Sequence, residues 1–257
     1  MLLTVLGCSG SIPGPNAPAS GYLLSADGFL LGIELGNGTF AALQAVADPF
    51  ALDALLFSHL HADHCADFSA LSVLRRYHPN PPHDPRERRL AVHAPSAAPE
   101  RFAAAYATDD VDRAVTDLSD VYEFHALRPG KIHIGPFEVV VAPAAHPCEA
   151  FSFRISHGGR SLAYTGDTGV TPALDDLVDG VDVLLAEACW THAPGERPLD
   201  LHLSGTEAGA LGAAGGVGRV LVTHIPPWTD TDAVMAEVRT AYDGEVILVE
   251  QGGVYDI

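Results

Sequence analysis

The sequence predicts an α/β protein in which two similar units, each a sheet with helices, pack together into one domain spanning residues 1–257. Two observations predict this class. In each half, short apolar runs typical of strands come first, and strands alternating with helical patterns follow. The chain is also long enough, with 47% hydrophobic residues, for a substantial core, and no stretch has the composition of a linker between the halves.

In the first half, apolar runs bounded by Gly and Pro predict strands, and apolar side chains three or four residues apart predict helices. The predicted strands are residues 2–7, 21–25, 29–34, 54–58 and 90–93, and the predicted helices are residues 39–47, a segment after Asp63, and residues 99–107. Residues 78–89 are rich in proline and charge, which predicts a surface loop. The sequence leaves open whether this loop closes over a site.

The second half repeats this arrangement. The predicted strands are residues 121–125, 137–141, 151–155, 161–165, 183–186, 220–223 and 246–249, and the predicted helices are residues 204–214 and 231–241. Ser204 and Glu207 have the spacing of a capping box, which predicts that a helix begins at Ser204.

Composition restricts the partners and the compartment. The net charge of −19 disfavours stable binding of nucleic acid, because an acidic surface repels a phosphate backbone. The first residues lack the pattern of a signal peptide, and no apolar run reaches the roughly 20 residues that a membrane-spanning helix needs. The four cysteines form no CxxC pair and indicate neither a disulfide framework nor a sulfur-ligated zinc site. We therefore expect a cytoplasmic protein without membrane contact.

The segment from Ser58 to His64 contains four side chains that can ligate metals, those of His59, His61, Asp63 and His64. Residues two apart in an extended segment face the same way, so His59 and His61 can hold one ion. The helix that follows can direct Asp63 and His64 towards a second ion nearby. Imidazole nitrogens and carboxylate oxygens suit zinc, iron or manganese. The alternative, a polar run on an exposed loop, is disfavoured by the apolar strand and helix that flank the segment.

Three predicted strands end in a residue that can bind a metal. His59, Asp167 and His224 each follow such an apolar run, at the carboxyl end where sites in layered α/β folds usually open. His146 follows the strand at 137–141 after a Pro-Ala-Ala turn. The alternative for each of these residues is an ordinary surface or turn position.

The segment His59-Leu60-His61-Ala62-Asp63-His64 resembles the HxHxDH hallmark of the metallo-β-lactamase superfamily. The resemblance covers nearly all of the chain and implies a four-layer αβ/βα sandwich, two packed mixed sheets with outer helices, and a two-metal site between the halves. It implies one divalent cation on His59, His61 and His146, and another on Asp63, His64 and His224, with Asp167 bridging them. Zinc is the expected metal, with manganese or iron as alternatives.

Within the superfamily, the chain resembles the ribonuclease Z-like phosphodiesterase branch. In that branch the histidine of a His-x-[ST] stretch contacts the scissile phosphate, and a Glu in the preceding strand orients it; His202, of His202-Leu203-Ser204, and Glu187 match these positions. A helix that begins at Ser204 would place a positive dipole end beside the phosphate. The alternatives are a surface histidine next to a well-capped helix and a plain strand-end carboxylate.

The whole chain is most similar to small actinobacterial members regarded as atypical class II cyclic-nucleotide phosphodiesterases. Segments 7–11, 18–22, 58–65, 75–79, 200–209 and 223–228 carry this resemblance. The chain departs from that group at Glu34, where relatives usually have Asp. A longer carboxylate at this position can still orient a ligand histidine from outside the set of ligands.

These resemblances imply a binuclear phosphodiesterase that cleaves a small phosphodiester, a 3′,5′-cyclic nucleotide such as cyclic AMP. A hydroxide held between the cations would attack phosphorus, and Asp63 would help to hold the cations and accept a proton. His202, steadied by Glu187, would bind a phosphate oxygen or protonate the leaving alkoxide.

Two other enzymatic functions remain as alternatives: a ribonuclease Z-like RNA 3′-processing endonuclease, and a thioester or lactone hydrolase of the same fold. The nuclease fits less well, because transfer-RNA-processing members carry a long basic arm, and only 21 positions separate His146 from Asp167. A non-catalytic binding module is disfavoured by the full set of seven ligands. Relatives are commonly dimers, which leaves a homodimer open.

Overall fold

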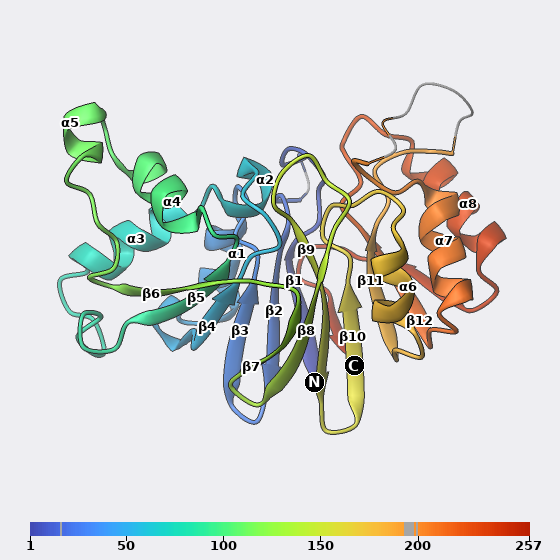
Figure 1. Ribbon diagram of the computed structural model, residues 1–257, viewed down its shortest axis with the longest axis horizontal. Coiled ribbons are helices and arrows are strands. Elements are labelled where there is room, and N and C mark those ends of the chain that lie inside the picture. Colours follow the sequence, from blue (N-terminus) through green and yellow to red (C-terminus); the bar gives the residue numbers. More distant parts are fainter. Residues whose placement is uncertain (16, 193–197, 199) are drawn as a thin grey trace.

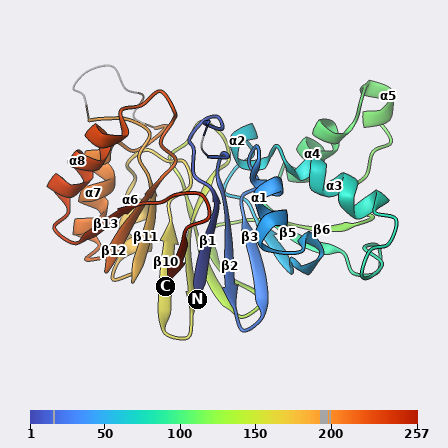
Figure 2. The ribbon, with the colours of Figure 1, turned by 180° about the vertical axis from the view of Figure 1, so that it is seen from behind.

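The computed structural model describes residues 1–15, 17–192, 198 and 200–257. Within these residues, two seven-stranded mixed sheets lie face to face, and helices cover the outer side of each sheet (Figures 1 and 2). The layers therefore run helix, sheet, sheet, helix. This arrangement confirms the predicted four-layer αβ/βα sandwich.

The first sheet joins both ends of the chain. In spatial order it contains β14 (Val254–Asp256), β1 (Leu2–Gly7), β2 (Gly21–Ala26), β3 (Phe29–Ile33), β4 (Ala54–Leu56), β5 (Leu90–Ala94) and β6 (Tyr122–Ala126). The pairs from β14 to β3 are antiparallel, and those from β3 to β6 are parallel. The parallel strands therefore present their carboxyl ends at one edge.

The second sheet repeats this mixture. In spatial order it contains β13 (Glu245–Leu248), β12 (Arg219–Thr223), β11 (Val183–Glu187), β10 (Arg160–Tyr164), β9 (Phe151–His157), β8 (Phe137–Pro143) and β7 (Gly130–Ile134). The strands from β10 to β13 are parallel, and those from β7 to β10 are antiparallel. The carboxyl ends of β10, β11 and β12 again share one edge.

The helices flank the two sheets on opposite sides (Figure 1). Beside the first sheet lie α1 (Thr39–Val46), a 3₁₀ helix (Pro49–Ala51), α2 (Ala62–Cys65), α3 (Phe68–Tyr77), α4 (Ala98–Tyr106) and α5 (Asp110–Arg113). Beside the second sheet lie α6 (Pro172–Val178), α7 (Gly205–Ala214) and α8 (Thr231–Ala241). Among the described residues, no helix has the length and apolar character needed to cross a membrane.

Three apolar cores hold the four layers together. The central core lies between the sheets and includes Ile33 from the first sheet and Phe153 from the second, both fully buried. One outer core joins the first sheet to its helices through residues such as Phe68, and the other joins the second sheet to α6, α7 and α8 through residues such as Leu184. Each such side chain contributes about 1.5–3 kcal/mol by leaving water.

The predicted strands and helices are present, with small shifts at their ends, but several short elements were not predicted. These are β7, β14, α5, α6 and the 3₁₀ helix. The predicted helix after Asp63 is divided into α2 and α3. The strand predicted at 29–34 ends at Ile33, because Glu34 takes a left-handed conformation with φ of 59°. The strand predicted at 54–58 ends at Leu56.

Residues 78–89 lie far from the carboxyl ends of the parallel strands. Arg88 in this loop pairs with Asp53, the residue before β4, at 3.0 Å, and its carbonyl accepts a hydrogen bond from the buried Arg75 guanidinium. The loop therefore sits at the amino end of β4 and leads into the amino end of β5. In Figure 1, α2 and the loop between β8 and β9 lie together at the opposite, upper edge. The 78–89 loop is not placed as a lid over that edge.

Candidate metal centre

The HxHxDH segment runs from the end of β4 into α2. His59 lies beyond the carboxyl end of β4, and His61, in extended conformation, is the residue just before α2. The short helix then directs Asp63 and His64 into the interior, where His64 is fully buried. The predicted change from an extended segment to a helix therefore sends the four side chains towards two neighbouring positions.

His59, His61 and His146 form the first group of candidate ligands. Nδ1 of His61 lies 3.0 Å from Nε2 of His59 and 3.2 Å from Nε2 of His146. Nδ1 of His146 lies 3.0 Å from the carbonyl oxygen of Leu201, which it can reach as a donor while Nε2 stays directed at the group. Burial lowers the pKa of His59 well below its ordinary value, so this imidazole is neutral, as a metal ligand must be.

Asp63, His64, Asp167 and His224 form the second group. Nε2 of His64 lies 3.1 Å from Oδ1 of Asp167, and Nε2 of His224 lies 3.3 Å from Oδ2 of the same carboxylate. Oδ2 of Asp63 is 3.5 Å from Nε2 of His64 and 3.7 Å from Nε2 of His224. The four side chains thus converge from α2 and from the ends of β10 and β12.

Asp167 also connects the two groups. Its Oδ2 atom lies 3.7 Å from Nε2 of His59 in the first group and 3.3 Å from Nε2 of His224 in the second. Burial would raise the pKa of this carboxyl, but the imidazoles of His224 and His64 outweigh burial and hold the pKa well below its usual range. The ionised carboxylate therefore lies where a bridging ligand between two cations is expected.

Buried polar atoms of the second group indicate that a cation fits between these residues. The buried Nε2 atoms of His64 and His224 and the Oδ1 atom of Asp167 lack a hydrogen-bond partner of suitable geometry among the described residues. Buried polar atoms are normally paired, so atoms that converge without partners indicate a site for a ligand. The donors are imidazole nitrogens and carboxylate oxygens, a set that suits zinc, manganese and iron.

The charge of the region supports the same fit. Glu34, Asp63, Asp167 and Glu187 are all buried, and none of them pairs with a Lys or Arg among the described residues. Buried carboxylates are costly unless positive charge compensates them. Burial opposes protonation of His64, yet the carboxylates of Asp167 and Glu34 outweigh it and raise the pKa of His64 well above its ordinary value. The cluster therefore favours positive charge at its centre.

Residues around the two groups hold the imidazoles in place. Oγ of Ser20 lies 2.7 Å from Nδ1 of His224, and Oγ of Ser58 lies 3.0 Å from Nδ1 of His59. Oε1 of Glu34 accepts the backbone N–H of Ser58 at 3.0 Å and lies 3.5 Å from Nδ1 of His64. The longer carboxylate at position 34 therefore reaches a predicted ligand histidine.

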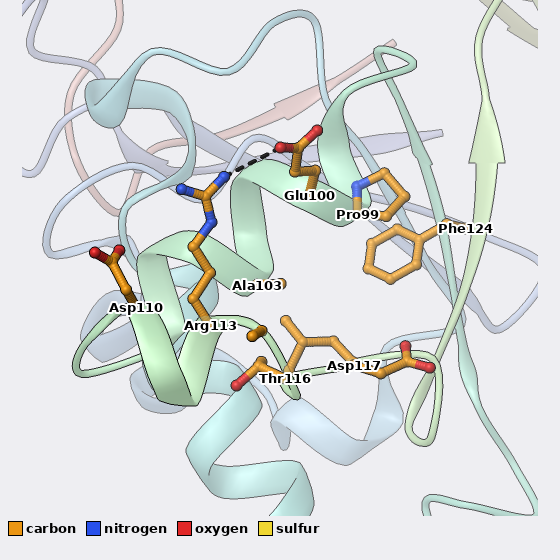
Figure 3. A pocket seen from close by; sticks show the side chains of 10 residues that line it. Pro99, Glu100, Ala103, Asp110, Arg113, Thr116, Asp117 and Phe124 are labelled. Atoms are coloured by element: carbon orange, nitrogen blue, oxygen red, sulfur yellow. Dashed lines mark hydrogen bonds and ion pairs between the residues drawn. The ribbon is translucent and has the colours of Figure 1, made fainter.

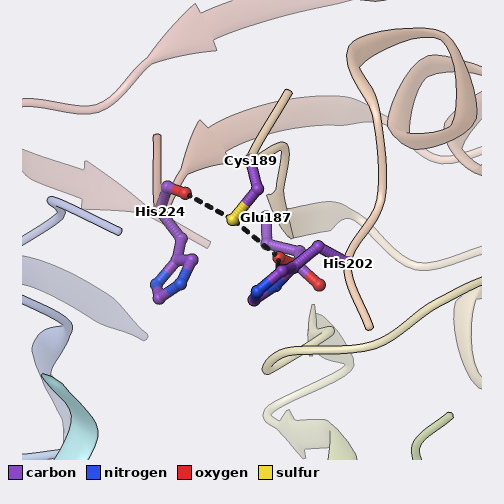
Figure 4. A group of neighbouring side chains, drawn as sticks. All are labelled: Glu187, Cys189, His202 and His224. Atoms are coloured by element: carbon purple, nitrogen blue, oxygen red, sulfur yellow. Dashed lines mark hydrogen bonds and ion pairs between the residues drawn. The ribbon is translucent and has the colours of Figure 1, made fainter. Parts of the chain in front are cut away.

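His202 and Glu187 meet beside the metal centre. Glu187 is the last residue of β11, and its Oε2 atom lies 2.8 Å from Nδ1 of His202 (Figure 4). Nδ1 of His202 is also 3.7 Å from Oδ2 of Asp167. Burial disfavours the charged imidazole, but the carboxylate of Glu187 outweighs it and raises the pKa of His202 to about 9. The ring of Trp190 packs edge-to-face on that of His202, with 5.3 Å between ring centroids.

The predicted helix start at Ser204 is confirmed. The Ser204 hydroxyl accepts the backbone N–H of Glu207, and the Glu207 carboxylate accepts the backbone N–H of Ser204. This capping box fixes the beginning of α7 two residues after His202. The structure thus combines the helix terminus, His202 and Glu187 in one region.

Sequence reasoning missed two residues of this region, Ser20 and Cys189. Nothing in the sequence pairs Ser20 with His224, because 204 positions separate them. Cys189 does have a signal, since it lies two residues after Glu187 and residues two apart in an extended segment face the same way. Its Sγ atom lies 3.5 Å from Oε2 of Glu187, and burial raises the pKa of the thiol well above its ordinary value (Figure 4).

Away from the metal centre, a hollow of about 580 Å³ lies beside α4 and α5. Pro99, Glu100, Arg113 and Phe124 line it, and Arg113 pairs with Glu100 at 3.1 Å (Figure 3). Its described lining residues include no predicted ligand and no predicted catalytic residue. The predicted ligands and catalytic residues therefore lie at the His/Asp cluster and not in this hollow.

The fold and the buried His/Asp cluster are those of a metallo-hydrolase. The family model of the β-lactamase superfamily domain matches residues 35–225, and the chain belongs to that superfamily. The Mycobacterium tuberculosis protein Rv1339 is 46% identical over 247 residues, which cover 95% of this chain and 88% of that protein.

Two solved structures extend the comparison. The metallo-β-lactamase fold protein YhfI of Bacillus subtilis, also named as a probable metallo-hydrolase, has 25% sequence identity and a TM-score of 0.86, covering 99% of this chain and 98% of that chain. The short form of human tRNase Z has 19% identity and a TM-score of 0.77, covering 100% of this chain and 99% of that chain. The similarity to human tRNase Z shows that the two proteins share a fold.

Proposed function

We propose that this protein is a binuclear metal-dependent phosphodiesterase, and that its substrate is a small phosphodiester, a 3′,5′-cyclic nucleotide such as cyclic AMP. The observation that carries the proposal is the pair of the half-buried His202 and the buried Glu187, joined at 2.8 Å beside Asp167. A hydrolase of thioesters or lactones needs the cations but has no evident use for this pair. A phosphodiester needs a group that binds a phosphate oxygen or protonates an alkoxide.

Each of the two groups of ligands would hold one of the proposed cations. His59, His61 and His146 would hold one, and Asp63, His64 and His224 the other, with Asp167 between them. Zinc is the proposed metal, and manganese or iron would fit the same donors. When bound, the cations would supply Lewis acidity, a lower pKa for water, and compensation of charge on phosphate oxygens.

The protein's own side chains would perform the remaining steps. Glu187 fixes the ring of His202 through Nδ1, which leaves Nε2 as the atom that donates to a phosphate oxygen or to the leaving alkoxide. Asp63, a member of the second group, would accept a proton from the attacking water. Proton transfer by a positioned side chain typically contributes ~10²–10⁴-fold to the rate.

Two observations favour a small substrate over transfer RNA. The chain between His146 and Asp167 is occupied by β9 and β10, which form a hairpin and leave no room for a long inserted arm. The net charge of −19 is also unsuited to a large polyanion. We therefore propose a nucleotide-sized substrate and no stable complex with nucleic acid.

A panel of four substrates tests the proposal. The purified protein is incubated with cyclic AMP, an aryl phosphodiester, precursor transfer RNA and a thioester, each with and without a chelator. Cleavage of cyclic AMP and of the aryl phosphodiester, abolished by the chelator, is the expected result. Cleavage of the thioester alone, or of the precursor RNA alone, would overturn it.

A further inference from the structure

Glu187 is fully buried, and its carboxylate receives donors from three directions. Oε1 accepts the backbone N–H of Thr168, Oε2 meets Nδ1 of His202 at 2.8 Å, and Sγ of Cys189 lies 3.5 Å from the same Oε2 atom. Figure 4 shows the thiol beside the carboxylate and on the side of His224. Cys189 therefore contacts the carboxylate that orients His202.

The thiol of Cys189 has a choice of two acceptors. Its Sγ atom is 3.5 Å from Oε2 of Glu187 and 3.4 Å from the backbone carbonyl oxygen of His224. A thiol has one hydrogen to donate, and a hydrogen bond to a charged acceptor is the stronger one. A thiolate here would face a carboxylate and a carbonyl oxygen, which repel it. The S–H group therefore donates to Glu187.

We propose that Cys189 is a positioning residue that holds the Glu187 carboxylate in the rotamer that orients His202 for proton donation. This inference rests on the proposed function. Cys189 touches neither substrate nor cation in this role and acts only through Glu187 and His202. Outer partners of this kind typically change activity by about 10- to 100-fold when they are removed.

The role predicts a dependence on the leaving group. Proton donation by His202 is needed when an alkoxide leaves, as in a cyclic nucleotide, but hardly when a good leaving group such as p-nitrophenolate departs. In Cys189→Ala, kcat for cyclic AMP should fall by about tenfold, whereas kcat for the aryl phosphodiester and both KM values stay near those of the wild type. Cys189→Ser, which keeps a hydroxyl donor, should recover most of the loss. A merely structural role would lower both activities together.

Cys8→Ala is the matched control, because the Cys8 thiol also faces a backbone carbonyl, that of Val249, at 3.5 Å, but does not contact Glu187. It should leave the ratio of the two activities unchanged. In a His202→Ala background, Cys189→Ala should have no further effect on cyclic AMP cleavage, because the two residues act as a unit. Additive losses in the double variant would overturn the proposal.

A measurement of the hydrogen bond itself keeps this inference separate from the proposed function. The S–H stretching band of Cys189 is identified by infrared difference between the wild type and Cys189→Ser. Glu187→Gln removes the charged acceptor and should shift this band to higher frequency. An unchanged band would show that the thiol donates to the carbonyl of His224 and would refute the inference. If the wild type cleaves no phosphodiester, the proposed function fails, while the infrared result still decides whether Cys189 supports Glu187.

Discussion

Nδ1 of the half-buried His202 lies 2.8 Å from Oε2 of the buried Glu187, and the other oxygen of Glu187 accepts the backbone N–H of Thr168, the residue after Asp167. The pair is therefore tied directly to the segment that carries Asp167, the proposed bridging carboxylate. A movement of β11 or of the segment at Asp167 would change the distance between His202, the proposed proton donor, and the proposed cations.

Replacing either member of the pair should impair catalysis and spare the cations. His202→Ala and Glu187→Gln should each lower kcat for cyclic AMP by ~10²–10⁴-fold, because the proton donor is lost or left without orientation. Steady-state kinetics measures the effect, and metal analysis of the same preparations should give the wild-type content. Full activity of His202→Ala would favour the thioester or lactone alternative.

Asp167→Asn should weaken both proposed cation sites. Its carboxylate oxygens lie 3.1 Å from Nε2 of His64 and 3.7 Å from Nε2 of His59, so one substitution removes negative charge from both groups. A metal that binds only the folded state stabilises it, so the Tm of the metal-loaded protein should fall as well. Asp232→Asn, at an exposed position of α8, serves as the control. Equal metal contents in the two variants would exclude a bridging role.

Ser20→Ala should lower the affinity for one cation without abolishing it. The Ser20 hydroxyl lies 2.7 Å from Nδ1 of His224 and fixes the direction of Nε2. Removing such an outer partner typically costs 10- to 100-fold in metal affinity. Competition with a chromophoric chelator measures this loss. An affinity equal to that of the wild type would show that the backbone alone orients His224.

Removing the cap of α7 or the cap of α8 should lower stability by a similar amount, but only the loss of the α7 cap should lower activity. Ser204 caps α7, and Asp230 caps α8 by accepting the backbone N–H of Ala233. Ser204→Ala and Asp230→Ala should each lower the free energy of unfolding by about 1 kcal/mol, measured by urea denaturation. Only Ser204→Ala should also reduce kcat, because Ser204, which caps α7, lies two residues after His202. Reduced kcat in Asp230→Ala would indicate a general loss of structure.

Most of the fold could be predicted because its strands are apolar and its helices are periodic. The two strands that were not predicted lack an apolar run. β7 is an edge strand with mostly exposed residues, and β14 has three residues, so neither contains an apolar run. α6 has only seven residues, but it does carry signals: Thr171 followed by Pro172 marks a helix start, and Leu174, Leu177 and Val178 have helical spacing.

The candidate ligands could be predicted because each stands in a motif or at the end of an apolar run, and the structure brings all of them together. The supporting residues could not be predicted in the same way. Ser20 meets His224 only because β1, β2 and β12 are brought together by the packing of two sheets. The distance between the 78–89 loop and the metal centre likewise depends on the direction of β4 and β5, which loop composition does not encode.

The central claim is that separate segments of this chain bind two adjacent divalent cations. The most direct measurement is elemental analysis of the purified protein after reconstitution with zinc and removal of loosely bound metal. The account predicts two zinc ions per chain, and fewer in Asp167→Asn. A wild-type protein that retains no transition metal would contradict it.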